Sequence, residues 1–169
     1  IDAVQTNDLV GSIDVWAPLI TGLAKNLDFY RRRQADGEDV WLYTCLVPAG
    51  PHSLNRFVEY PLTRVRLLHW ANYASGTGGY LHWAYNWWVA TKDPRAGKWR
   101  LPPGDEWIVY PRLGGVDDSI RFEAMLEGIQ DYELLRQLAA RDREAADAIC
   151  QALVRFSRDA TKGYEFDDG

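Results

Sequence analysis

The chain is poor in the residue types that carry metal, redox and phosphate chemistry. Its 169 residues include two cysteines, three histidines and one methionine. Cys45 and Cys150 show no CxxC spacing, so two buried thiols or a disulfide stay open, and His52, His69 and His82 show no spacing of the HxxxH kind. No glycine-rich loop follows a predicted strand, and no Ser or Cys nucleophile elbow is present. We therefore expect no metal and no cofactor.

Excess positive charge and long apolar runs are also missing. The chain has 19 Lys and Arg against 24 Asp and Glu, a net charge of -5, which argues against a phosphate-tracking surface for nucleic acid. No apolar run approaches the roughly 20 residues that span a bilayer, and no signal-peptide pattern is visible. The sequence thus predicts no nucleic-acid partner and no membrane span, and it does not indicate a compartment.

Short apolar segments alternate with helical patterns along the chain. The segments 13–18 (IDVWAP), 40–47 (VWLYTCLV) and 79–88 (GYLHWAYNWW) carry little or no charge, as buried parallel strands do. Residues 107–110 predict a short extra strand. The end of the chain, residues 161–169, is acidic and predicts a frayed tail.

Apolar residues at helical spacing predict the helices. One helix contains Leu23, Leu27 and Tyr30, and the next begins at Pro61 and ends near Gly76. Two more follow one another directly, the first behind the cap candidates Asp118 and Ser119 and the second with Ala146, Ile149, Cys150 and Leu153 on one face.

Alternation of strands and helices predicts an α/β fold with a parallel sheet. Residues 1–169 are enough for one core, so we expect a single unit. A (β/α)₈ barrel takes about 250 residues. The chain would supply about three of its βα units plus terminal helices. The open sheet edges would then pair with the rest of the same polypeptide or with a second copy.

Aromatic residues gather where the predicted strands end. Trp16 follows the first strand, Tyr43 lies in the second, and residues 83–88 place Trp83, Tyr85, Asn86 and Trp87 at the end of the third. Flat rings suit the C–H faces of sugars, and an amide can bond their hydroxyls. The pattern predicts a carbohydrate-binding wall. The alternative is that about half of these rings pack against helices.

Acidic residues and one histidine are weaker candidates for the same site. Asp14 lies within the first strand, where it needs a partner or a polar cavity. His82, in the third strand, is a candidate ligand contact or a hydrogen-bonded core residue. Asp105-Glu106 precedes a predicted strand beside Pro102-Pro103-Gly104, so we expect a solvated turn away from the site.

The order of several blocks resembles glycoside hydrolase family 123 catalytic domains. The resemblance covers roughly residues 13–140, and its most specific parts are the tryptophan-rich third strand and the helix reading RFEAMLEGIQDYELL. The blocks are 14–18 (DVWAP), 40–45 (VWLYTC), 60–61 (YP), 66–70 (RLLHW), 79–88 (GYLHWAYNWW), 110–111 (YP), 119–124 (SIRFEA) and 127–133 (EGIQDYE).

The resemblance implies the C-terminal part of a (β/α)₈ barrel that removes terminal β-linked N-acetylgalactosamine by substrate-assisted hydrolysis with retention. In that family an adjacent Asp-Glu pair at the end of an earlier strand supplies the acids, which implies a pair upstream of Ile1 and no catalytic acid within this chain. The resemblance thus implies that the chain alone is inactive. Two alternatives stay open: a non-catalytic carbohydrate-binding protein and a purely structural half-barrel.

Overall fold

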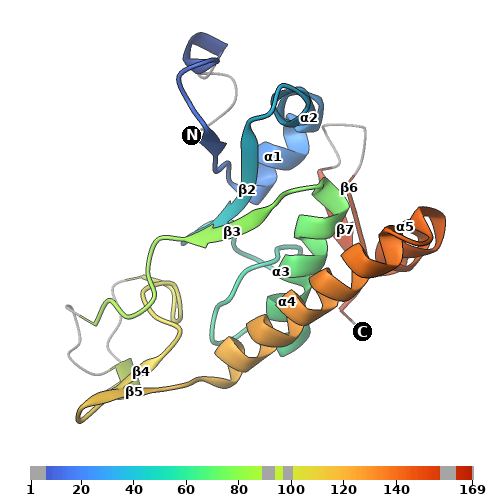
Figure 1. Ribbon diagram of the computed structural model, residues 1–169. Helices are drawn as coiled ribbons and strands as arrows, with labels where there is room; N and C mark the ends of the chain where they lie inside the picture. Colours follow the sequence, from blue (N-terminus) through green and yellow to red (C-terminus); the bar gives the residue numbers. More distant parts are fainter. Residues whose placement is uncertain (1–6, 89–93, 97–100, 157–162, 169) are drawn as a thin grey trace.

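A computed structural model describes residues 7–88, 94–96, 101–156 and 163–168 of the chain (Figure 1). Its centre is a parallel sheet of three strands in chain order, β1 (Val15–Trp16), β2 (Asp39–Thr44) and β3 (Gly79–His82). In the register of this sheet, Tyr43 lies opposite Leu81. The carboxyl ends of β2 and β3 therefore meet at one edge.

Helices connect the strands and form one layer with the C-terminal part of the chain. Helices α1 (Ile20–Lys25) and α2 (Leu27–Ala35) link β1 to β2, and α3 (Leu62–Ser75) leads into β3. Figure 1 shows the long helix α4 running alongside α3, with the β4–β5 hairpin extending from its N-terminal end. The remaining elements are η2 (Asn7–Leu9), η3 (Pro94–Ala96), β4 (Tyr110–Arg112), β5 (Gly115–Asp117), α4 (Ile120–Ala139), α5 (Arg143–Leu153), β6 (Val154–Phe156) and β7 (Tyr164–Phe166).

The two faces of the parallel sheet differ in burial. Side chains alternate along a strand, and in β2 the residues Val40, Leu42 and Thr44 are fully buried. Val40 and Leu42 join the core with residues of α1, α2 and α3. On the opposite face, Val15 and Leu81 stay 42% and 40% exposed. Parallel sheets are usually covered on both faces. This sheet is covered on one face only, and its other face is apolar and open.

A side-chain cap begins α4, and one glycine lets it pack closely on α3. The Ser119 hydroxyl accepts a hydrogen bond from the backbone N–H of Phe122 at 3.2 Å, so the predicted cap at Ser119 is confirmed. At Gly128 a Cβ atom would overlap the backbone carbonyl of Arg66. The absence of a side chain there lets the two helices approach closely.

The mixed α/β architecture is confirmed, while the boundaries of several elements differ from expectation. The first helix divides at Asn26 into α1 and α2. The extra strand expected at 107–110 begins at Tyr110 instead, and the third strand ends at His82 rather than Trp88. Whether the sheet belongs to a barrel stays a prediction.

The tail expected to fray is ordered where the structure describes it. Strand β7 pairs antiparallel with β6, and the Tyr164 hydroxyl accepts the N–H of Leu54 at 3.0 Å. The rings of Tyr164 and Phe166 pack against the core. Residues 164–166 thus form a paired strand within the segment that was expected to fray. Residues 161, 162 and 169 lie outside the described part.

Candidate functional site

Exposed aromatic rings occupy the carboxyl-end region of β2 and β3. We call Tyr43, Trp83, Tyr85 and Trp87 the aromatic face. Trp83, Tyr85 and Trp87 are 42%, 46% and 40% exposed, and Tyr43 is half-buried. The rings of Trp83 and Trp87 contact edge to face, with centroids 5.2 Å apart. Rings this exposed are uncommon in a covered core and mark a contact surface.

The segment after the β3 loop returns to pair with the residues that follow β3. The N–H of Ile108 donates to the Tyr85 carbonyl and the N–H of Trp87 donates to the Glu106 carbonyl, both at 2.9 Å. Asn86 and Trp107 form an antiparallel bridge between these bonds. This long-range pairing brings residues 105–109 to the carboxyl end of the sheet.

Asp105 and Glu106 are therefore buried beside the aromatic face. They are 0% and 1% exposed, so the solvated turn expected for this pair is wrong. The pairing partner lies about 20 residues earlier in the chain, and local sequence around Pro102-Pro103-Gly104 gives no sign of it.

The Asp105 carboxylate has two aromatic neighbours. The Trp83 indole N–H donates to Oδ2 at 3.1 Å, and Nε2 of His82 lies 3.4 Å from Oδ1. Nδ1 of His82 accepts the N–H of Ala84 at 3.3 Å, which leaves the ring proton on Nε2, facing Asp105. Desolvation lowers the pKa of His82, although the nearby Asp105 carboxylate opposes this shift. The neutral ring is thus favoured.

Two buried arginines hold the returning segment in place. Nη2 of Arg56 donates to the carbonyl of Asp105 at 3.1 Å and also to that of Ala84. Arg121 donates from Nη1 to the Arg56 carbonyl at 2.6 Å and from Nη2 to the Trp107 carbonyl at 3.2 Å. Burial lowers the pKa of Arg56 to about 10, so the guanidinium stays charged at neutral pH near the Asp105 carboxylate.

Local structure explains how these arginines reach the site. The Asn55 side chain donates to the carbonyls of Cys45 and Pro48 at 2.8 and 2.9 Å, which closes the loop after β2 next to Arg56. Gly104 has φ +94°, and a Cβ there would crowd the Arg121 guanidinium. Sequence reasoning missed both arginines. Arg121 could have been found from its place in the block SIRFEA, whereas no pattern in the sequence around Arg56 points to it.

The expected site residues divide into three groups in the structure. Tyr43, Trp83, Tyr85, Asn86 and Trp87 lie at the carboxyl-end edge, and Asn86 is exposed. The side chain of His82 is only 3% exposed and faces inward. Two others lie away from the aromatic face, Trp16 and Asp14.

Trp16 belongs to the core, on the helix side of the sheet. Its ring packs edge to face on Phe29 and Tyr30, with centroids 5.5 and 6.3 Å away, and its indole N–H donates to Glu38. Asp14 is exposed and precedes β1, because the strand begins at Val15, two residues later than expected. Asp14 is therefore not a buried charge, and it does not need the partner or polar cavity that was expected.

Tyr43 is tied to this site by charge as well as by position. Burial, followed by the neighbouring Cys45, raises the pKa of Tyr43 to about 12, with a smaller contribution from Asp105. The phenol therefore stays protonated near neutral pH. It can donate one hydrogen bond to a ligand at the carboxyl-end edge.

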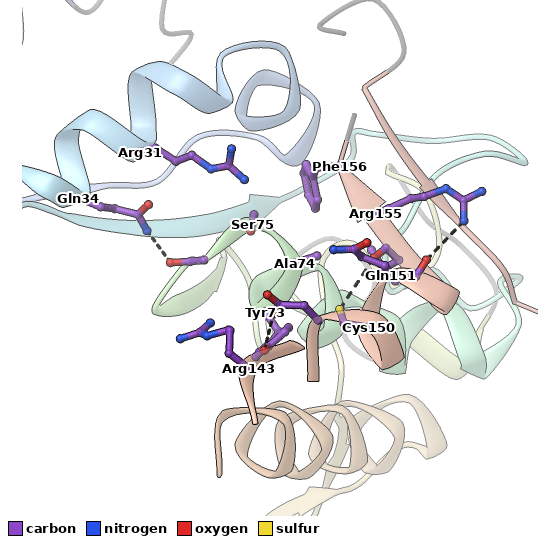
Figure 2. A pocket seen from close by; sticks show the side chains of 13 residues that line it. Arg31, Gln34, Tyr73, Ala74, Ser75, Arg143, Cys150, Gln151, Arg155 and Phe156 are labelled. Atoms are coloured by element: carbon purple, nitrogen blue, oxygen red, sulfur yellow. Dashed lines mark hydrogen bonds between the residues drawn. The ribbon is translucent and has the colours of Figure 1, made fainter. Parts of the chain in front are cut away.

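A cavity of about 600 Å³ lies at the opposite end of β3 (Figure 2). Gln34 donates there to the carbonyl of Gly76, which precedes β3, and the Tyr73 hydroxyl donates to Asp147 at 2.8 Å. Arg31 and Arg143 also line the cavity. Parallel sheets place ligand sites at the carboxyl ends of strands, so this cavity is not our candidate site.

Metal, disulfide and membrane features are absent from the described ranges. Neither Cys45 nor Cys150 is in a disulfide. Within residues 7–88, 94–96, 101–156 and 163–168, no group of three or more His, Cys, Asp or Glu could hold a metal ion. Over the same ranges, none of the helices has both the length and the apolarity to cross a bilayer.

Comparison with known proteins gives a family and a structural relative. The model of the glycoside hydrolase 123 catalytic domain matches residues 3–138. A solved family 123 glycoside hydrolase from Clostridium perfringens, described in a study of glycolipid glycan hydrolysis, is similar in fold, with a TM-score of 0.67 and 19% identity. The match covers 89% of this chain and 26% of that one, so the chain spans about a quarter of the length of this relative. No curated protein matches. Because the family model spans most of the chain, the chain belongs to the glycoside hydrolase 123 family, within the catalytic domain.

Proposed function

We propose that this chain forms the sugar-binding wall of a glycoside hydrolase that acts on terminal β-linked N-acetylhexosamine, with N-acetylgalactosamine as the preferred sugar. The observation that carries the proposal is the aromatic face at the carboxyl ends of the strands. Family membership supports the reaction class. The glycolipid glycan hydrolysis named for the relative supports a glycan substrate.

The proposed reaction is substrate-assisted hydrolysis with retention. The acetamido oxygen of the sugar attacks the anomeric carbon while an enzyme acid protonates the departing oxygen, giving an oxazolinium. Water then attacks the same carbon and the ring of the intermediate opens. In this scheme the aromatic face holds the apolar face of the sugar, and the Asn86 amide and the Tyr43 hydroxyl bond its polar groups.

We assign no catalytic acid to this chain. Asp105 is fully buried and accepts the Trp83 indole, so its carboxylate does not reach a leaving oxygen. We propose that the acids come from another part of the same polypeptide, as the remaining strands of a (β/α)₈ barrel would supply them. The open apolar face of the sheet and the 26% coverage of the solved relative support this arrangement.

Hydrolysis of a chromogenic β-N-acetylgalactosaminide tests the proposal. The chain and the full-length gene product are compared at matched concentration, and we expect activity only in the longer protein. Activity of the chain itself would place the acids within it. If neither protein hydrolyses any of several β-N-acetylhexosaminides, the result would contradict the proposed hydrolase activity and favour a binding role.

Trp87→Ala in the full-length product separates sugar binding from a structural role of the aromatic face. Loss of one stacking ring is expected to lower kcat/KM about tenfold, equivalent to ~1.4 kcal/mol, with little change in Tm. Leu113→Ala is the control, because Leu113 is fully exposed in the turn of the β4–β5 hairpin. A fall in Tm with unchanged kcat/KM would support the structural half-barrel instead.

A further inference from the structure

An aspartate is buried directly beneath an exposed tryptophan of the aromatic face. Asp105 is fully buried, whereas the Trp83 ring that donates to its Oδ2 is 42% exposed. A buried carboxylate is costly unless charged or strongly polar groups surround it. Here the indole, the imidazole of His82 and the guanidinium of Arg56 all come close.

The Trp83 ring is bonded through its N–H and contacts the rings of His82 and Trp87, with centroids 6.4 and 5.2 Å away, yet 42% of the residue stays exposed. A half-exposed side chain otherwise samples several rotamers. Hydrogen bonds to a charged acceptor are roughly twice as strong as neutral ones, so the bond from the indole N–H to Asp105 favours one ring orientation. Nε2 of His82 lies 3.4 Å from the other oxygen of the same carboxylate, and its Nδ1 accepts the N–H of Ala84 at 3.3 Å.

Because Trp83 contacts Trp87 edge to face, the orientation of the Trp83 ring affects the surface that the two rings form together. The two ring planes meet at 66°, so rotation of Trp83 would change the shape of the surface that both present. A surface that is ordered before the ligand arrives loses less conformational entropy on binding.

We propose that Asp105 is a positioning residue that holds the Trp83 ring in its sugar-stacking orientation, with Nε2 of His82 lying 3.4 Å from its other carboxylate oxygen. This inference rests on the proposed function for the role of the ring in sugar binding. Asp105 itself touches no substrate. It acts through the indole N–H, and so its effect must disappear when that N–H is absent.

The test uses the full-length gene product with Asp105→Asn, Trp83→Phe and the double variant. Asp105→Asn is expected to raise KM about fivefold to tenfold with kcat nearly unchanged, because ground-state binding is weakened. Trp83→Phe keeps a ring without the N–H. In that background Asp105→Asn should add nothing to KM.

A readout independent of sugar keeps the inference separable from the proposed function. The protein is labelled with 5-fluorotryptophan, and the Trp83 resonance is identified as the one lost in Trp83→Phe. Asp105→Asn should shift and broaden that ¹⁹F resonance. The matched control is Asp131→Asn, since Asp131 accepts the Trp70 indole at 2.8 Å and both residues lie on helices, α4 and α3. It should move the Trp70 resonance and leave KM unchanged.

An unmoved Trp83 resonance in Asp105→Asn overturns the positioning role whatever the enzyme does. A moved resonance with unchanged KM overturns its importance for sugar. Equal rises of KM in the Trp83 and Trp83→Phe backgrounds also overturn it, because Asp105 would then act by another route. If the resonance moves while the unaltered protein neither binds nor cleaves the sugar, the anchoring stands and the proposed function fails.

Discussion

Single residues show where sequence reasoning reaches its limit. The rings of the aromatic face could be predicted, because their density at one strand end is visible in the chain. The carboxylate beneath them could not, because Asp105 meets Trp83 through the pairing of residues 106–108 with 85–87. Likewise, Trp16 and Trp83 are both strand-end tryptophans, yet the first lies in the core and the second is exposed. Which side of the sheet a ring faces depends on register, which residue type does not reveal.

Among single residues, the buried His69 leads us to predict that the free energy of unfolding depends on pH. It is buried in α3, where desolvation lowers its pKa to about 4, against about 6.5 for an unfolded histidine. Between these values the unfolded chain binds a proton that the folded chain does not. The free energy of unfolding should therefore fall as pH drops from about 6.5 to 4, and be insensitive to this group above that window.

Urea unfolding at several pH values measures this slope, with His69→Gln as the comparison because glutamine does not titrate. The slope between about pH 6.5 and 4 should become shallower in His69→Gln. His82, whose pKa is also lowered, leaves a residual slope of the same sign. Parallel profiles for His69→Gln and the unaltered chain would show that the pKa of His69 is the same in the folded and unfolded states, which contradicts the prediction. His52→Gln is the control, because His52 is exposed.

Secondary-structure elements were easier to predict than the connections between them. Helices α3, α4 and α5 lie where periodic apolar positions predict them, and Ser119 caps α4 as expected. The face that α4 buries differs from its apolar positions, because Leu126 and Ile129 are 48% and 43% exposed. Hairpins β4–β5 and β6–β7 were missed as pairs, because strands of three residues carry too few positions for a period of two. The close approach of α3 and α4 depends on a single glycine, Gly128. In the sequence, a glycine within a helical pattern indicates only a lower helix propensity and gives no sign of a packing contact.

At the scale of the whole molecule, helices cover one face of the parallel sheet and leave the other face open. The helices bury Val40 and Leu42, while Val15 and Leu81 and the aromatic face stay exposed. In the proposed enzyme the rest of the polypeptide covers this face. Periodicity and length indicated an incomplete sheet, but they could not say which residues would be left open, since that depends on the register between β2 and β3.

The isolated chain is therefore expected to associate with itself through the open face. Sedimentation velocity over a hundredfold range of concentration should show a reversible oligomer. Leu81→Lys should weaken this association by about tenfold or more, because burial of a leucine side chain is worth roughly 1.5–3 kcal/mol and a lysine there brings charge into the contact. Leu134→Lys is the matched control, since Leu134 is 63% exposed on α4, away from the sheet. A monodisperse and cooperatively unfolding monomer at every concentration would mean that the open face needs no cover, and would remove one support for its place inside a larger barrel.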